Sequence, residues 1–100
     1  MKLSTLGLMK KVGCIVCGFD AVGREIKSPT SGISGVAVAN DLSEKTLKEL
    51  RYLIDKFRPE LQMFELHADM KQIESVIGKK TGIIAVTDEG FWKSLTKIEQ

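Results

Sequence analysis

The 100-residue sequence has few of the residues that mark specialised chemistry. It contains two cysteines, two prolines, one histidine, one tryptophan and one tyrosine, and its formal net charge at pH 7 is only +2. So few cysteines exclude a disulfide-stapled secreted scaffold and fit a reducing cytoplasm. No apolar run is long enough to cross a bilayer. The apolar start of the chain is cut by Lys10 and Lys11, and no small-residue cleavage site follows it. We therefore expect a cytoplasmic protein with no membrane partner.

Positive charge is dispersed along the sequence. The basic spots are Lys10–Lys11, Lys79–Lys80 and Lys93 with Lys97, and acidic residues are interleaved throughout. Nucleic-acid-binding domains usually concentrate their charge far more than this. Weak nucleic-acid binding is therefore the third of three functional hypotheses, behind a protein-interaction module and a thiol- or metal-dependent protein.

The chain does contain enough apolar material for one core. With 43% hydrophobic residues, a chain of this length buries roughly two-thirds of its unfolded surface and needs no covalent staples. The sequence shows no internal repeat, low-complexity tract or linker. Residues 1–100 are expected to form a single globular domain.

The hydrophobic pattern predicts a mixture of helices and strands. Helices are expected over residues 3–9, 44–57 and 88–98, where apolar residues recur at helical spacing. Strands are expected over residues 12–19, 24–27, 61–67 and 83–87, the first two joined by a hairpin turn over Asp20–Gly23. Residues 33–39 fit either a strand or the lead-in to a helix, and residues 69–80 lean towards a helix without excluding a strand.

The polarity of the predicted strands indicates how they are covered. Strands 12–19 and 83–87 are apolar on both faces, which is typical of strands buried between two layers. Strand 61–67 carries Met63, Glu65 and His67 on one face, and this mixed polarity indicates an edge strand. Together these features predict an α/β (α+β) sandwich, with a mostly antiparallel central sheet and helices on both faces.

Cys14 and Cys17 form the motif that most suggests chemistry. Their C-x-x-C spacing occurs in zinc and redox sites. On a regular strand, however, residues three apart point to opposite faces, so we expect the two thiols to enter opposite layers of the core. Zinc would need further ligands, and His67 is the only histidine. Core packing is the preferred interpretation. A metal or redox site using Cys14, Cys17 and His67 remains the alternative, because a bulge at Gly18 would let the thiols converge.

No other pattern predicts catalysis. The carboxylates that invite comparison with two-metal nucleases are Asp20, Glu49, Asp69 and Asp88. Each of them is more simply a turn residue, a residue at the start of a helix or loop, or part of a solvated helix face. Residues Gly78–Thr81 resemble a fragment of a phosphate-binding loop but lack its first glycine and its Gly-Lys-Ser/Thr order. We predict no catalytic residue and no cofactor.

The order of the predicted elements resembles the roadblock family, which has the dynein light-chain-type fold. Gly13–Ile26 matches the family's apolar strand, Asp-x-x-Gly turn and return strand. Gly82–Leu95 matches its closing strand, Asp-containing turn and final helix, and the helix ending at Phe57 matches its middle helix. The resemblance spans nearly the whole chain and contains no catalytic signature. Residues 33–39 and the helical pattern of residues 69–80 depart from the family.

This resemblance implies a non-enzymatic, homodimeric or heterodimeric interaction module that binds small Ras-like GTPases or motor components. The predicted edge strand 61–67 can pair with its copy across a dimer axis, with the middle helix beside it. The candidate dimer contacts are Met63, Glu65, His67, Leu47 and Arg51.

Overall fold

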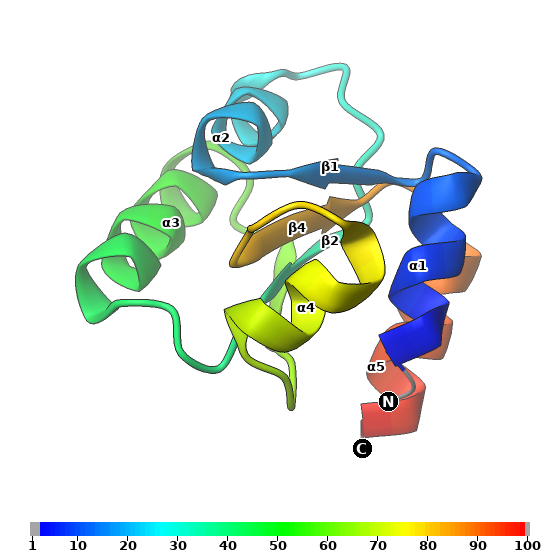
Figure 1. Ribbon diagram of the computed structural model, residues 1–100. Coiled ribbons are helices and arrows are strands. Elements are labelled where there is room, and N and C mark those ends of the chain that lie inside the picture. The colour runs from blue at the N-terminus through cyan, green and yellow to red at the C-terminus, as the bar shows by residue number, and fades with distance from the viewer. Residues whose placement is uncertain (1–2, 100) are drawn as a thin grey trace.

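The computed structural model describes residues 3–99, and the side chains of residues 4–96. Helices and strands alternate along these residues (Figure 1). The elements are α1 (Leu3–Lys11), β1 (Ile15–Cys17), α2 (Phe19–Lys27), β2 (Gly35–Val38), α3 (Glu44–Phe57), β3 (Gln62–Glu65), α4 (Met70–Ile77), β4 (Ile83–Val86) and α5 (Glu89–Glu99).

The four strands form one mixed sheet in the order β1-β4-β2-β3. β4 pairs antiparallel with both β1 and β2, whereas β2 and β3 run parallel. All residues of β2 and β4 are buried, as their continuous apolar sequences require. β1 and β3 are the two edges, so the prediction of an edge strand within residues 61–67 is confirmed.

The sheet lies between two layers of helices (Figure 1). On one face, Val22 and Ile26 of α2 and Leu50 and Ile54 of α3 pack against Val36 and its neighbours. On the other face the buried side chains come from α1, α4 and α5, and they include Leu6, Met9, Ile73, Ile77, Trp92 and Leu95. The predicted sandwich, with helices on both faces of a mostly antiparallel sheet, is confirmed.

The predicted hairpin over Asp20–Gly23 is wrong, because residues 19–27 form α2. Gly18 has a φ of +94°, a conformation open to glycine, and it turns the chain directly from β1 into the helix. The sequence signal for this helix is the pair Val22 and Ile26, four residues apart and both buried. The segment on which the roadblock resemblance began is therefore a three-residue strand followed by a helix.

The two ambiguous segments resolve into β2 and α4. Three of the helices, α3, α4 and α5, begin at polar side-chain caps. The Ser43 hydroxyl accepts a hydrogen bond from the amide of Thr46 at the start of α3. Asp69 and Gln72 form a reciprocal capping box at the start of α4, and Asp88 accepts from the Phe91 amide in α5. The side chains of Leu3 and Ile98, expected on apolar helix faces, lie outside the described residues. Within residues 3–99, no helix is both long enough and apolar enough to span a membrane.

Candidate functional site

Two pairs of lysines that are far apart in the sequence come together beside β1. Lys10 and Lys11 end α1, while Lys79 and Lys80 directly follow Gly78, the residue that ends α4. The ammonium group of Lys10 donates a hydrogen bond to the carbonyl oxygen of Ile77 in the last turn of α4. Gly78 has a φ of +80°, so the chain turns there, and a Cβ at this glycine would lie 3.7 Å from the Lys10 ammonium nitrogen. We call these four exposed residues, Lys10, Lys11, Lys79 and Lys80, the lysine surface.

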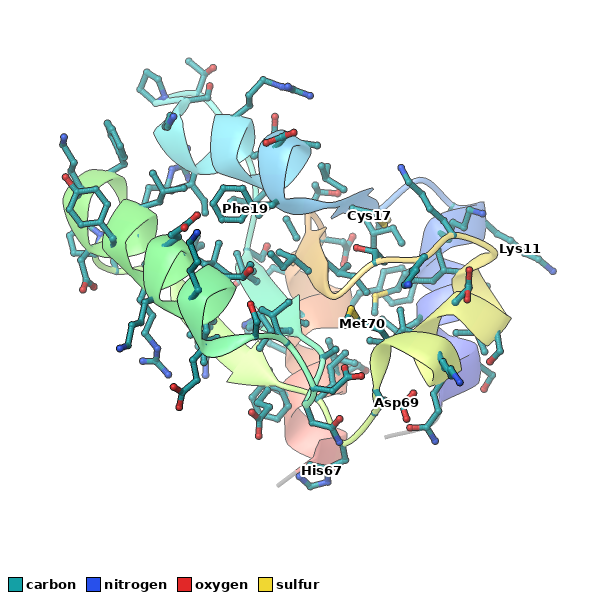
Figure 2. All side chains as sticks on the ribbon, turned by 60° about the vertical axis from the view of Figure 1, so that its left-hand side comes forward. Lys11, Cys17, Phe19, His67, Asp69 and Met70 are labelled. Atoms are coloured by element: carbon teal, nitrogen blue, oxygen red, sulfur yellow. The ribbon has the colours of Figure 1, made fainter. Side chains whose placement is uncertain are left out.

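The Cys17 thiol lies within the electrostatic reach of this surface. Partial burial raises the pKa of Cys17, while the positive charges of Lys79 and Lys10 act in the opposite direction. Both ammonium groups must lie near the thiol to have this effect. Lys10 and Lys79 of the lysine surface therefore lie near the end of β1. In Figure 2, Cys17 lies between Lys11 and Phe19, which is the first residue of α2.

The N-terminus of α2 adjoins the same end of β1. The helix begins at Phe19, directly after Gly18, and no side chain caps it. The first amide groups of a helix carry partial positive charge and form a ready-made site for anions. Asp20 is the acidic residue in this first turn, and it is exposed. The site thus combines two of the lysines, Lys10 and Lys79, near the end of β1 with the uncapped helix N-terminus that follows this strand.

No carboxylate among residues 4–96 forms a salt bridge with the lysine surface. The salt bridge between described side chains joins Lys93 to Glu89, with 3.4 Å between the ammonium and carboxylate atoms, one turn apart on α5. Lys93 therefore belongs to a locally balanced pair, and the side chain of Lys97 lies outside the described residues. Of the three basic spots in the sequence, the structure joins the first two and separates them from the third.

A groove of about 460 Å³ opens between α1 and α4 next to the lysine surface. Its lining residues are Ser4, Gly7, Leu8, Lys10, Lys11, Val76 and Ile77. The helices approach closely because Gly7 has no side chain; a Cβ there would lie 3.3 Å from the carbonyl oxygen of Val76. The groove therefore has mainly apolar walls, with cations at one end.

The prediction that Cys14 and Cys17 enter opposite layers is wrong. Both pack against the cluster beneath α1, α4 and α5, whereas Val16 packs on the other face. The reason is that β1 begins only at Ile15, so Cys14 precedes the alternating segment. Its thiol lies 3.9 Å from the Val12 carbonyl oxygen, to which it donates.

The structure does not assemble the alternative metal site. His67 follows β3 at one edge of the sheet, while Cys14 precedes β1 and Cys17 ends it at the opposite edge. Among the described residues, no three side chains of the kinds that bind metals converge. The carboxylates compared with nucleases are also dispersed: Asp69 and Asp88 cap two different helices, and Glu49 is exposed on α3. Thr81 is buried and donates its hydroxyl hydrogen to the Ile83 carbonyl, so it does not complete a phosphate loop.

The candidate dimer contacts divide into two groups. Met63 and Leu47 are partly buried against the cluster beneath α2 and α3, where they stabilise the core. The other three candidates, Glu65, His67 and Arg51, are exposed. The structure thus places these three on the surface at or near the free edge of β3 and on α3.

Comparison with known proteins identifies the fold and leaves the family open. No protein-family model and no curated protein matches this sequence. The structure is similar to that of a protein of unknown function from Bacillus halodurans, with a TM-score of 0.83 and 22% sequence identity over 98% of this chain and 96% of the other. At that identity, the likeness shows that the two chains share the same fold from end to end.

Proposed function

We propose that this chain is an RNA-binding domain that holds phosphate groups on the lysine surface and at the N-terminus of α2. The observation that carries the proposal is the contact of Lys10 with Ile77, 67 residues later in the chain, which brings the lysine pair at the end of α1 to the end of α4, where the second pair follows. A dispersed charge pattern in the sequence becomes a concentrated one in the fold, which removes the main argument against a nucleic-acid partner.

The chemistry of this surface suits a polyanion. Its four ammonium groups are exposed, and no carboxylate of residues 4–96 is paired with them. Lysine binds phosphate as a point charge, and binding releases the counterions condensed on a nucleic acid. The uncapped amides of α2 add directional donors for a phosphate oxygen.

The shape of the surface favours folded RNA over duplex DNA. Proteins that recognise duplex DNA commonly place a helix or a two-stranded ribbon in the major groove. Here the lysines lie at the ends of α1 and α4, around the end of a short strand, and no helix projects from them. Loops and bulges of RNA bring phosphates into a compact cluster and expose unstacked bases. A compact group of cations matches such a cluster.

Fluorescence anisotropy with three labelled probes tests this proposal. The probes are a hairpin RNA that carries a bulge, the same hairpin without the bulge, and a DNA duplex of matched sequence. We expect the bulged RNA to bind tightest. The variant Lys79→Ala/Lys80→Ala should weaken binding, whereas the control Lys45→Ala/Lys71→Ala, which removes two exposed lysines elsewhere, should not. Equal binding of the three probes, or equal effects of the two variants, would contradict the proposal.

A homodimeric interaction module, with a small Ras-like GTPase as the partner that the roadblock resemblance implies, is the second candidate. The free edge of β3 supports it, because an unpaired strand can pair with its copy. The amide of Leu66 bonds to Val38 of β2, so in an alternating strand the amide of Glu65 points away from β2. Glu65→Pro should therefore break such a dimer without removing a bond to β2. Light scattering that finds only monomer at micromolar concentration would rule this candidate out.

A further inference from the structure

A second groove lies between α2 and α3, on the opposite face of the sheet from the Cys17 thiol. It has a volume of about 390 Å³ and is lined by Phe19, Lys27, Lys48, Glu49, Tyr52 and Leu53. Phe19 and Lys27 are the first and last residues of α2. The groove therefore touches both ends of this helix, which lie about 12 Å apart at 1.5 Å per residue. Figure 2 shows Phe19 between the two helices.

Aromatic side chains lie where a ligand in this groove would meet them. Tyr52 is 61% exposed, so most of this large aromatic side chain is open to a ligand. Phe19 and Leu53 are half-buried against the core and form the apolar part of the groove. An exposed tyrosine beside an apolar floor is suited to stacking on a planar group.

Lysines surround this aromatic residue. Lys48 and Lys56 lie four residues before and after Tyr52, so all three share one face of α3. The Lys56 ammonium group lies 5.6 Å from the centroid of the Tyr52 ring. Lys27 adds a third cation from α2, and Glu49 is the one acidic residue of the lining. Asp55, three residues after Tyr52, adds a second carboxylate on that face of α3, so the groove and its rim carry three lysines against two acidic residues.

The groove is continuous with the proposed phosphate site. Phe19 follows Gly18, so the residue at the end of the groove also begins the uncapped turn of α2. We expect an RNA strand held at this helix N-terminus to reach the groove directly, because Phe19 belongs to both. Aromatic rings flanked by cations are the combination that proteins use to bind single-stranded nucleic acid.

We propose that the α2–α3 groove binds a single-stranded RNA segment that extends from the RNA on the lysine surface, with one base stacked on Tyr52. The continuity of the path rests on the proposed function. The stacking site rests on the groove itself, on its aromatic lining and on its charge.

The test compares the bulged hairpin RNA with and without a single-stranded oligouridine tail. Stacking on one aromatic side chain changes affinity by roughly tenfold, so we expect the tail to improve wild-type binding by about that factor. Tyr52→Ala should abolish this gain and leave the tailless affinity unchanged, whereas Tyr52→Phe should keep the gain. Both variants should fold, because Tyr52 is exposed, and thermal melts check this. A tail that gives no gain, or a gain that survives Tyr52→Ala, would overturn the inference.

A second readout separates this inference from the proposed function. Oligouridine that contains 4-thiouridine is photo-crosslinked to the protein without any hairpin, and the linked peptides are mapped. Cross-links at Tyr52 or Phe19 support the groove even if the hairpin fails to bind, in which case only the proposed function fails. Cross-links confined to other surfaces would overturn the inference. An apolar peptide that binds the groove in place of RNA would overturn it as well. Neither result bears on the lysine surface, which has its own test.

Discussion

At the scale of single residues, close approaches at glycine decide how the core fits together. The indole ring of Trp92 lies against Gly35 of β2, where a Cβ atom would be 2.2 Å from the ring atom Cε2. The Trp92 indole N–H donates to the Gln62 side-chain oxygen at 3.0 Å, and its ring meets Phe64 edge-on. Because the ring is held on two sides, it has little freedom to move away from the backbone of β2.

We expect Gly35→Ala to destabilise the fold by about 3 kcal/mol, because overpacking a rigid ring forces the backbone or the ring to shift. Urea denaturation followed by tryptophan fluorescence measures the change. Gly32→Ala is the matched control, since nothing lies within 4 Å of a Cβ there, and it should cost less than about 0.5 kcal/mol. Equal stability of the two variants would show that Trp92 does not lie on Gly35.

The thiol of Cys17 reports on the lysine surface. Burial raises its pKa, and the Lys79 charge partly offsets this increase. Lys79→Ala should therefore raise the pKa further, lower the fraction of thiolate and slow alkylation at Cys17 by iodoacetamide at mildly alkaline pH. Mass spectrometry of the modified peptides gives the rate, with Lys71→Ala as the control. If Cys17 reacts at the same rate in Lys79→Ala and in the wild type, Lys79 does not lie beside it.

The raised pKa also has a consequence for stability. A thiol with a higher pKa in the folded state than in the unfolded state stabilises the fold below its unfolded pKa, and this contribution falls as pH rises towards the folded pKa. The pKa of a free cysteine is about 8.5. Above that pH, we expect the stability of Cys17→Ser to fall less steeply with rising pH than that of the wild type. Denaturation midpoints across that range would test this, and parallel curves for the two proteins would contradict it.

At the scale of elements, α2 is where sequence pattern and structure differ most. Asp20 and Gly23 are spaced as in a hairpin turn, and residues 24–27 are too few to show helical periodicity alone. The helix forms because Gly18 ends β1 with a positive φ, and Val22 and Ile26 then pack on the sheet. Gly23 is helical and buried, with its Cβ position 3.6 Å from Leu53 Cδ1, an ordinary contact distance.

A pair of glycine variants tests this helix directly. Gly23→Ala should stabilise the protein by up to about 1 kcal/mol, because alanine favours a helix and the added methyl group contacts Leu53 without a clash. Gly18→Ala should destabilise it by about 1 kcal/mol or more, because its φ of +94° strains any residue with a Cβ. Thermal melts of both variants decide the matter. Destabilisation by Gly23→Ala would instead indicate that Gly23 occupies the left-handed position of a hairpin turn and not a position within a helix.

The other elements differ in how well local pattern predicts them. α3 follows from its apolar stripe and from the Ser43 cap, and β4 from its apolar sequence between Gly82 and Asp88. β2 could not be separated from a helix start, because four small or branched apolar residues fit both. The lysine surface could not be predicted, because it depends on the reversal at Gly78 and on the packing of α1 against α4. Neither feature leaves a periodic trace in the sequence.

At the scale of the whole molecule, the sheet order places β1 at an edge with its two flanking helices on opposite faces. α1 precedes β1 from the layer that also contains α4 and α5, and α2 follows it into the other layer (Figure 1). The end of α1, the start of α2 and the segment after α4 consequently meet around one short strand. This arrangement brings the cations together and opens a groove on either side of them.

The dependence of RNA affinity on salt tests the central claim most directly. If the four lysines each neutralise a phosphate, log K for the bulged hairpin RNA should fall with log salt concentration with a slope of about −3, since each contact contributes roughly 0.7–0.9. Lys79→Ala/Lys80→Ala should make the slope shallower by about 1.5, and Lys45→Ala/Lys71→Ala should leave it unchanged. A slope near zero, or the same slope in the wild type and in Lys79→Ala/Lys80→Ala, would contradict the account.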